Sequence, residues 1–342
     1  MATILKTKSI YFNDIIMLPK LGAVRSRKDV PDEKFRIIIS PMSAVIGTAF
    51  IAEAAKLGLS VALPRFTTIE NKVKLSSIFN KNKYNENQIC FVAIGLNEKG
   101  EDLVKLVELS NSNNWLIDIA NGYIPQLKSG IMKLDSILCE RGIRLNNLML
   151  GNVVTSEGID YVIDCTKSYC QNLFIRIGIG NGRNCQTSDT SAINRGQITE
   201  LIECSESLKY KQNQNNCFLV SDGGIDRGGF ALKAWGAGAD YVLMGGLFSN
   251  SLEAETNISG DGTYFGCASE KQNKLAGLDK HSEGKITQIN KEELKPLAYI
   301  VKELWGGISS GISYSGYTSI SKFIGNATFE VKINSLPPKK RI

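Results

Sequence analysis

Histidine and paired cysteines, the usual ligands of zinc, are sparse in this chain. Its 342 residues include one histidine, His281, and eight cysteines with no Cys-x-x-Cys pair. That spacing is common in structural zinc sites. The N-terminal residues also lack the charged and apolar regions of a secretion signal. We therefore expect a cytoplasmic protein with reduced thiols, and neither a zinc site nor a disulfide framework.

Long hydrophobic runs and a concentrated basic surface are also missing. No apolar run approaches the roughly 20 residues that a membrane-spanning helix requires. The net charge of +6 is modest, and the basic residues are scattered along the chain. We expect neither a membrane nor a nucleic acid as partner, because a nucleic-acid site gathers its basic residues on one face. The charge suits an anionic small molecule at least as well.

The fingerprint of a Rossmann domain is absent as well. No Gly-x-Gly-x-x-Gly sequence occurs, and the most glycine-rich loop has glycine at alternate positions, at Gly178, Gly180 and Gly182. A nicotinamide cofactor, if the protein uses one, is therefore not predicted to bind in a Rossmann manner.

Eight short apolar segments alternate with segments of helical periodicity. Near-continuous hydrophobicity is typical of strands buried on both faces of a parallel sheet. The predicted strands are 37–40, 59–63, 89–95, 115–120, 148–152, 173–177, 217–222 and 240–245. The predicted helices are 48–57, 69–79, 100–109, 124–139, 156–166, 193–207, 228–235 and 294–305. Eight such repeats favour an α/β fold of the (β/α)₈ TIM-barrel type over an open, doubly wound sheet.

One long segment, 249–291, interrupts this regular alternation after the eighth predicted strand. It is rich in glycine, serine and charged residues, and it is too long for a plain connection. Long loops in compact domains are often lids or binding loops. No linker divides the chain, so we predict one catalytic barrel over residues 1–342, with 249–291 as an active-site flap.

The loop after the sixth predicted strand is the strongest candidate for a nucleophile site. Gly178, Gly180 and Gly182 make it pliable, and Cys185 and Thr187 stand at its far end. A thiol at the C-terminal end of a barrel strand occupies the usual place of a catalytic nucleophile. The alternative interpretation is a glycine-rich turn with a buried structural cysteine.

The last two strand ends have the features of a phosphate site. Asp222 is followed by Gly223 and Gly224, and the next strand is followed by Gly245 and Gly246. Barrels frequently bind phosphate at the loops after strands seven and eight, where backbone amides are free of side chains. Asp222 could accept hydrogen bonds from two sugar hydroxyls, or it could cap a helix.

Taken together, the motifs resemble the IMP dehydrogenase/GMP reductase family of purine-nucleotide oxidoreductases. They occur in the order of that family across nearly the whole chain. The matching segments are Ser40-Pro41-Met42, 151–155, 178–187, 221–225, 236–240 and 244–246. An ordered set of this kind is far more specific than any single motif.

Within the family, the resemblance favours the reductase branch. Residues 118–123 resemble the reductase pattern, and 282–285 resemble the segment that supplies its catalytic carboxylate. No insertion is present that could hold the regulatory CBS modules common in dehydrogenases. Two alternatives remain: an IMP dehydrogenase without CBS modules, and a catalytically altered barrel that binds a purine nucleotide without turning it over.

The resemblance implies a covalent mechanism on GMP or a related purine nucleotide. Cys185, as thiolate, is expected to attack C2 of the guanine ring and release ammonia, giving a thioimidate. NADPH is expected to deliver a hydride to C2, which releases IMP. Thr187 and Glu283 are implied as the pair that handles the proton of the leaving amine.

The resemblance also implies the binding residues. Those expected at the nucleotide are Ser40, Met42, Arg183, Asp222, Gly223, Gly224, Gly245, Gly246, Tyr264, Gly266, Cys267, Ala268 and Ser269. Those expected at the nicotinamide cofactor are Arg65, Asp118, Ala120, Lys280, Ser282 and Lys285. The carbonyls of Gly180, Gly182 and Cys185 are expected to bind K⁺. Family members assemble as tetramers, so a homotetramer is expected.

Several positions depart from the family pattern. In the cysteine loop, Asn181 stands where the family usually has proline, and Arg183 where it usually has serine. Cys267 and Ala268 replace methionine and serine in the base-recognition segment. Arg183 could bind phosphate in a bidentate manner, or it could equally block the site or serve a differently phosphorylated substrate. These changes leave the base and sugar preference open, with a deoxynucleotide or a modified purine nucleotide among the alternatives.

Overall fold

Eight parallel strands close into a barrel in this computed structural model, which describes residues 8–22, 24–166, 169–209 and 216–332. The strands follow one another in chain order, and the first pairs with the last to close the sheet. They are β2 (Ile37–Ile39), β3 (Ser60–Ala62), β4 (Cys90–Ile94), β5 (Asn114–Asp118), β6 (Asn147–Val153), β7 (Asn172–Ile177), β8 (Asn216–Asp222) and β9 (Tyr241–Met244). The predicted TIM barrel is confirmed, and each predicted strand overlaps one of these.

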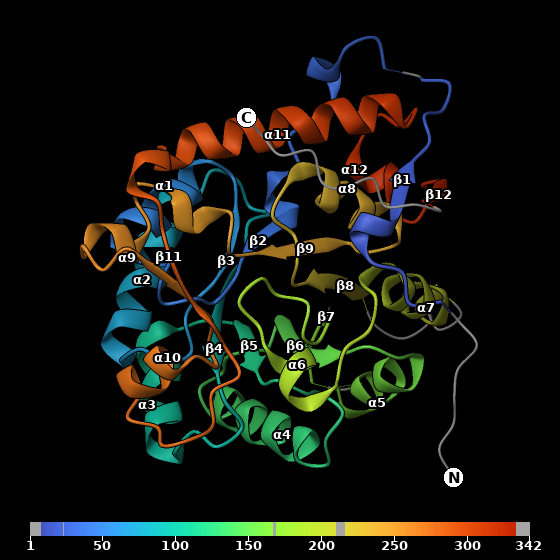
Figure 1. Cartoon of the computed structure of the whole chain (residues 1–342). Helices are drawn as coiled ribbons and strands as arrows, with labels where there is room; N and C mark the ends of the chain where they lie inside the picture. The colour runs from blue at the N-terminus through green and yellow to red at the C-terminus, as the bar shows by residue number, and fades with distance from the viewer. Residues whose placement is uncertain (1–7, 23, 167–168, 210–215, 333–342) are drawn as a thin grey trace.

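Helices surround the strands on the outside of the barrel (Figure 1). They are α1 (Thr48–Lys56), α2 (Ile69–Asn82), α3 (Gly100–Ser110), α4 (Gln126–Cys139), α5 (Ser156–Thr166), α7 (Gln197–Lys209), α8 (Gly228–Gly236) and α11 (Leu297–Tyr314). The helix that we predicted to end at 305 continues to Tyr314, because Ile308 and Ile312 extend its buried face.

The predicted start of another helix is also wrong. The segment 193–207 was expected to be helical throughout, but α7 begins only at Gln197. A short helix, α6 (Thr187–Ser191), precedes it and ends at Ala192 in the left-handed conformation, with φ 59°. The N-terminal segment packs against the chain just before α7. A Cβ atom on Gly196 would lie 2.5 Å from the backbone of Ile10, so this position has no room for a side chain.

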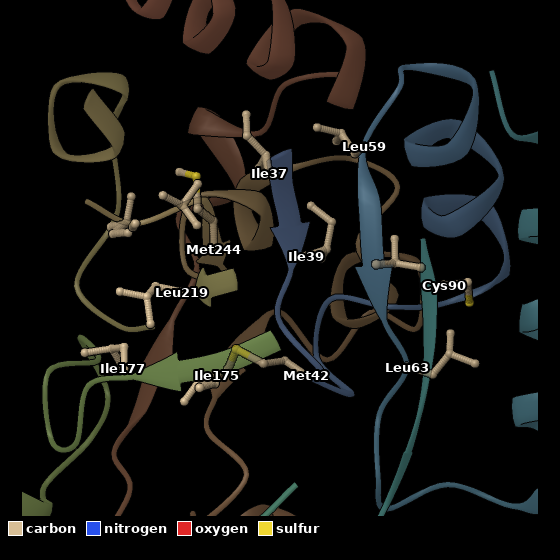
Figure 2. Packing of buried hydrophobic residues seen from close by; sticks show 14 of the residues in the cluster. Ile37, Ile39, Met42, Leu59, Leu63, Cys90, Ile175, Ile177, Leu219 and Met244 are labelled. Carbon is tan, nitrogen blue, oxygen red and sulfur yellow. The ribbon is translucent and has the colours of Figure 1, made fainter. Parts of the chain in front are cut away.

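The core has two layers, one outside the barrel wall and one inside it. Outward-facing side chains such as Ile37 and Ile39 of β2, and Ile175 and Ile177 of β7, belong to the large cluster between sheet and helices (Figure 2). The interior holds a second cluster, in which Phe174 of β7 packs edge-on against other rings. Its members are Ile38, Ala62, Phe91, Ala93, Leu116, Met149, Phe174, Val220, Tyr241 and Leu243.

Strand alternation places a charged layer above this apolar interior. Side chains two residues apart on a strand share a face. Phe174 is followed on its face by Arg176, Leu116 by Asp118, and Val220 by Asp222. All three charged residues therefore lie toward the C-terminal ends of their strands, the end at which barrel enzymes place their active sites.

The segment 249–291, which we predicted to be a flap, contains regular structure. It includes α9 (Glu255–Ile258), β10 (Thr263–Phe265), α10 (Glu270–Leu275) and β11 (Ile286–Gln288), and β10 pairs with β11 as an antiparallel ribbon. Its role as a flap stays a prediction.

The remaining elements lie mainly near the two ends of the chain. They are η1 (Phe12–Asp14), β1 (Ile15–Met17), η2 (Arg27–Asp29), η3 (Lys34–Arg36), η4 (Phe248–Asn250), η5 (Lys291–Glu293), α12 (Ile320–Phe323) and β12 (Phe329–Val331). β1 and β12 pair with each other in a second antiparallel ribbon. None of the helices within the described ranges is both long and apolar enough to span a membrane.

Candidate active site

Three side chains form a hydrogen-bonded chain at the end of the cysteine loop. The Sγ of Cys185 donates to Oγ1 of Thr187 at 3.1 Å, and this hydroxyl donates to Oε2 of Glu283 at 2.8 Å. Cys185 is half-buried, as are its two partners. A thiol, a hydroxyl and a carboxylate are thus joined in an order that can carry a proton away from sulfur.

Backbone bonds bring Glu283 to the loop from 96 residues further along the chain. The amide of Gln186 donates to the Glu283 carbonyl at 2.7 Å, and the amide of Lys285 donates to the Asn184 carbonyl at 2.8 Å. Between them, Gly284 forms a bridge with Cys185. The catalytic carboxylate expected from the sequence therefore lies beside the expected nucleophile.

The other side of the same segment contacts the expected base-recognition residues. The amide of Glu283 donates to the Ala268 carbonyl at 2.9 Å, and Oγ of Ser282 donates to the same carbonyl at 3.2 Å. Gly284 has no room for a side chain, because a Cβ atom there would lie 2.9 Å from the amide nitrogen of Ser269. Gly266 closes this turn by accepting the Ser269 amide at 3.1 Å.

Asn184 fixes the loop to the ribbon formed by β10 and β11. Its side chain donates to the Tyr264 carbonyl at 2.9 Å and accepts from Oγ1 of Thr287 at 2.9 Å. Asn184 is buried with 5% exposure. The sequence reasoning gave it no role, although its place directly before Cys185 was a usable signal.

A buried arginine joins two predicted binding residues. Nη1 of Arg176 donates to Oδ1 of Asp118 at 2.6 Å, while Nε and Nη2 donate to Oδ2 of Asp222 at 3.0 and 2.8 Å. Burial lowers the pKa of Arg176, but the carboxylates of Asp222 and Asp118 outweigh it and the pKa lies above its ordinary value. Arg176 therefore stays positively charged, and the two carboxylate groups that it binds compensate this buried charge.

One carboxylate oxygen of Asp222, Oδ1, takes no part in this network. Nδ2 of Asn152 also donates to Oδ2, at 2.7 Å, so these bonds all use Oδ2 and none uses Oδ1. The alternative role as a helix cap is wrong, because α8 begins at Gly228 and Arg227 is its N-cap. Sequence reasoning assigned no role to Arg176 or Asn152. A charged residue inside a predicted buried strand was the available signal, since such a charge needs partners.

The two turns with the expected phosphate-binding glycines pack against two different segments of the chain. Gly223 and Gly224 have positive φ of 95° and 74°, and they pack on the cysteine loop. Gly245 packs on Ser40 and Met42, because a Cβ atom there would lie 2.6 Å from the Met42 sulfur. These contacts bring the turns after β8 and β9 to the same end of the barrel as Cys185.

Tyr264 and Cys267 complete the wall beside Met42. Oη of Tyr264 lies 3.3 Å from the Met42 sulfur and 3.4 Å from the position that a Cβ atom on Gly246 would take. Sγ of Cys267 donates to the Pro41 carbonyl at 3.4 Å, and burial raises the pKa of this thiol to about 12. Cys267 is therefore a neutral packing group. Arg183, another residue expected at the nucleotide, is exposed on the cysteine loop.

Two of the expected cofactor residues, Arg65 and Lys280, lie beside Phe66, and Arg65 also contacts Asp118. Nη1 of Arg65 donates to the Asp118 carbonyl at 3.0 Å. Its guanidinium lies 4.7 Å from the ring centre of Phe66, and Nζ of Lys280 lies 5.5 Å from the same ring. Lys285 and Ala120 are exposed. Two cations thus flank one aromatic ring, and sequence reasoning missed Phe66.

The other cysteines are poor candidates for the nucleophile. None of the eight forms a disulfide. Burial raises the pKa of Cys90 and Cys170 to about 12 and that of Cys217 to about 11. Cys185, by contrast, is joined to a hydroxyl and, through it, to a carboxylate.

Comparison with known proteins agrees with this geometry. A family model described as an IMP dehydrogenase / GMP reductase domain matches residues 10–335. The chain belongs to this family. The resemblance inferred from the ordered motifs is confirmed, and membership places the chain among the oxidoreductases of purine metabolism.

The similar curated proteins are named GMP reductases. The chain is 25% identical to the GMP reductase of Vibrio atlanticus (strain LGP32), in an alignment that covers 93% of each chain. It is 26% identical to that of Onchocerca volvulus, over 96% of this chain and 92% of the relative. It is 24% identical to that of Caenorhabditis elegans, over 93% of this chain and 90% of the relative.

Proposed function

We propose that this protein is a GMP reductase-like enzyme that converts GMP, or a related purine nucleotide, to IMP and ammonia with NADPH. The observation that carries the proposal is the hydrogen-bonded chain from Cys185 through Thr187 to Glu283. It supplies a nucleophile and a proton carrier at the end of the barrel that also holds Asp222 and the glycine turns.

The proton path gives each residue of the chain a role. As the thiol proton passes to Thr187, and the hydroxyl proton to Glu283, the thiolate of Cys185 forms and bonds to C2 of the purine. The same path in reverse protonates the departing amine, so that ammonia leaves and a thioimidate remains. The nicotinamide cofactor, when bound, supplies a hydride to C2. The C2–S bond then breaks, and IMP and the thiolate are released.

Nucleotide binding is assigned to the same end of the barrel, beside the cysteine loop. Oδ1 of Asp222 is the oxygen left for ribose hydroxyls, since Oδ2 is held by Arg176 and Asn152. The glycine turns after β8 and β9 would present amides to the phosphate. Arg183, exposed on the cysteine loop, adds a positive charge for the same group.

The residues around Phe66 fit a phosphate-bearing cofactor. Nε of Arg65 is buried and has no hydrogen-bond partner among the residues that the structure describes, although Oε1 of Glu98 forms an ion pair with it at 3.9 Å. An unsatisfied cationic donor of this kind favours an anionic acceptor nearby. We assign the cofactor to Arg65, Asp118, Ala120, Lys280, Ser282 and Lys285, with Lys280 and Lys285 meeting its phosphates.

Potassium and assembly belong to the same proposal. The carbonyls of Gly180, Gly182 and Cys185 are assigned to K⁺. The Gly182 carbonyl also accepts a hydrogen bond from the Cys185 amide at 3.0 Å. Replacing K⁺ by Na⁺ in the assay tests the ion. Light scattering tests the proposed homotetramer.

A nucleotide panel tests the proposed reaction. Purified protein is mixed with NADPH and GMP or dGMP, and separately with NAD⁺ and IMP, and the change in cofactor redox state and the release of ammonia are followed together. Equal release of ammonia and oxidised cofactor with a guanine nucleotide, abolished in Cys185→Ala, supports the proposal. Reduction of NAD⁺ with IMP would instead identify a dehydrogenase without CBS modules. Binding without turnover of any purine nucleotide would identify a nucleotide-binding barrel.

A further inference from the structure

A buried carboxyl group lies under the cysteine loop without a part in the proposed reaction. Glu200 stands in the first turn of α7 and is 1% exposed. Its Oε1 accepts a hydrogen bond from Nδ2 of Asn181 at 3.1 Å. Its Oε2 is buried without a hydrogen-bond partner among the described residues. Burying a carboxyl group in this way is costly, so the group needs an explanation.

The charges around Glu200 favour its neutral form. Burial raises its pKa well above the ordinary 4.5, and the nearby carboxylate of Asp222 raises it further. Arg195 opposes this through its charge, but its guanidinium binds Glu203 and the Val154 carbonyl. The Asn181 amide also favours the ionised form, but these two effects do not offset burial. A protonated carboxyl can still accept the bond from Asn181 through Oε1.

Asn181 is the point at which the cysteine loop contacts the glycine turn after β8. A Cβ atom on Gly223 would lie 3.0 Å from the Gly182 amide and 3.2 Å from the Asn181 carbonyl carbon. A Cβ atom on Gly224 would lie 3.0 Å from the Asn181 carbonyl oxygen. The two backbones therefore pack closely at Asn181, with the Gln197 side chain also beside Gly224, and a restraint on Asn181 acts on both backbones.

An asparagine at this position needs an outside restraint. It stands between Gly180 and Gly182, two residues that add little stiffness, and the family pattern usually has proline here. Proline fixes its own φ, whereas asparagine does not. The bond to Glu200 ties the loop to α7, which is packed on the barrel wall.

We propose that Glu200 is a positioning residue that holds the cysteine loop, through Asn181, against the Gly223–Gly224 turn. It acts on Cys185 and on the phosphate turn together, without touching either reactant. Its catalytic consequence rests on the proposed function, but its effect on the loop does not.

Four single variants test the role. Glu200→Ala and Asn181→Ala each remove the bond, while Glu200→Gln keeps an oxygen that can accept it. Glu206→Gln is the matched control, because Glu206 is an exposed carboxylate on the same helix. The first readout is the rate at which iodoacetamide alkylates Cys185, followed by peptide mass spectrometry. The second is the KM and kcat for the nucleotide found active in the panel.

The expected result is graded. Both alanine variants should alkylate Cys185 several-fold faster than the wild type, since the loop is freer, and should lose roughly tenfold in kcat/KM, as befits one buried hydrogen bond. Their double variant should be no worse than either single one. Glu200→Gln and Glu206→Gln should behave like the wild type.

The alkylation readout separates failure of this inference from failure of the proposed reaction. If no purine nucleotide is turned over, faster alkylation in both alanine variants still supports the positioning role. Unchanged alkylation in Asn181→Ala, with the melting temperature retained, overturns it. Equal damage in Glu200→Gln and Glu200→Ala overturns it too, because the accepting oxygen would then be irrelevant. Should Glu200→Ala fail to fold, Asn181→Ala decides alone.

Discussion

The guanidinium of Arg176 binds one oxygen of Asp222 through two nitrogens, Nε at 3.0 Å and Nη2 at 2.8 Å. Its third bond reaches Asp118 on the far side. The residue assigned to the ribose and the residue assigned to the cofactor thus share one buried cation. This arrangement fixes the positions of both carboxylate groups before any ligand arrives.

Arg176→Met should therefore damage both binding sites and the fold. Removing the cation leaves two carboxylates buried without their partner, a change that typically costs about 3–5 kcal/mol. We expect a large fall in melting temperature and a raised KM for both nucleotide and cofactor. Lys105→Met is the control, since its ion pair with Glu70 is exposed and should contribute little to stability. Similar small losses in the two variants would argue against a central role for Arg176.

Thr187 should be needed for its hydroxyl and not for its bulk. Thr187→Val keeps the shape but breaks the path between Cys185 and Glu283, and we expect kcat to fall by about 10²–10⁴-fold with little change in KM. Thr187→Ser restores a hydroxyl and should recover much of the rate. The measurement is steady-state turnover of the nucleotide active in the panel. Equal rates for Val and Ser would show that the hydroxyl carries no proton.

The barrel could be predicted from the sequence because its strands are buried on both faces. Segments such as 173–177 are almost continuously apolar, and the inner face of β7 packs in the interior while the outer face meets the helices. The start of α7 could not be predicted. Residues 193–196 lie where the N-terminal segment crosses, and no local pattern reveals a contact with Ile10.

The site was only partly predictable for a similar reason. Cys185 and Thr187 stand two residues apart in one motif, so their proximity was visible in the sequence. The link between Arg176, Asp118 and Asp222 depends on the register of three separate strands. The contact between Glu200 and Asn181 depends on how α7 packs, and it joins residues of ordinary type. Neither contact joins residues at a short, fixed spacing in the sequence, so no sequence motif could reveal it.

Gly178 should not tolerate a side chain. Its φ is 129°, and a Cβ atom would lie 2.2 Å from the carbonyl oxygen of Asp222. We expect Gly178→Ala to cost more than about 1–3 kcal/mol, since it combines backbone strain with a clash against backbone. Gly100→Ala is the control, because no atom lies within 4 Å of its added Cβ. Chemical denaturation of both variants measures the difference, and a Gly178→Ala protein as stable as the control would show that the loop can move aside.

Glu200 should make the stability of the protein depend on pH in a defined direction. Because its pKa is raised in the folded state, the folded protein holds this proton more tightly than the unfolded chain does. The stability linked to Glu200 is fully present below its ordinary pKa of 4.5 and is lost as the pH rises toward the raised folded value. Glu200→Gln cannot ionise, so it should match the wild type in acid and melt at a higher temperature near neutral pH. The test is the difference in melting temperature between the two proteins across this range, with Glu206→Gln as reference. A difference that stays constant with pH would mean that the pKa of Glu200 is the same in the folded and unfolded protein, and one that favours the wild type at neutral pH would mean that folding stabilises its ionised form.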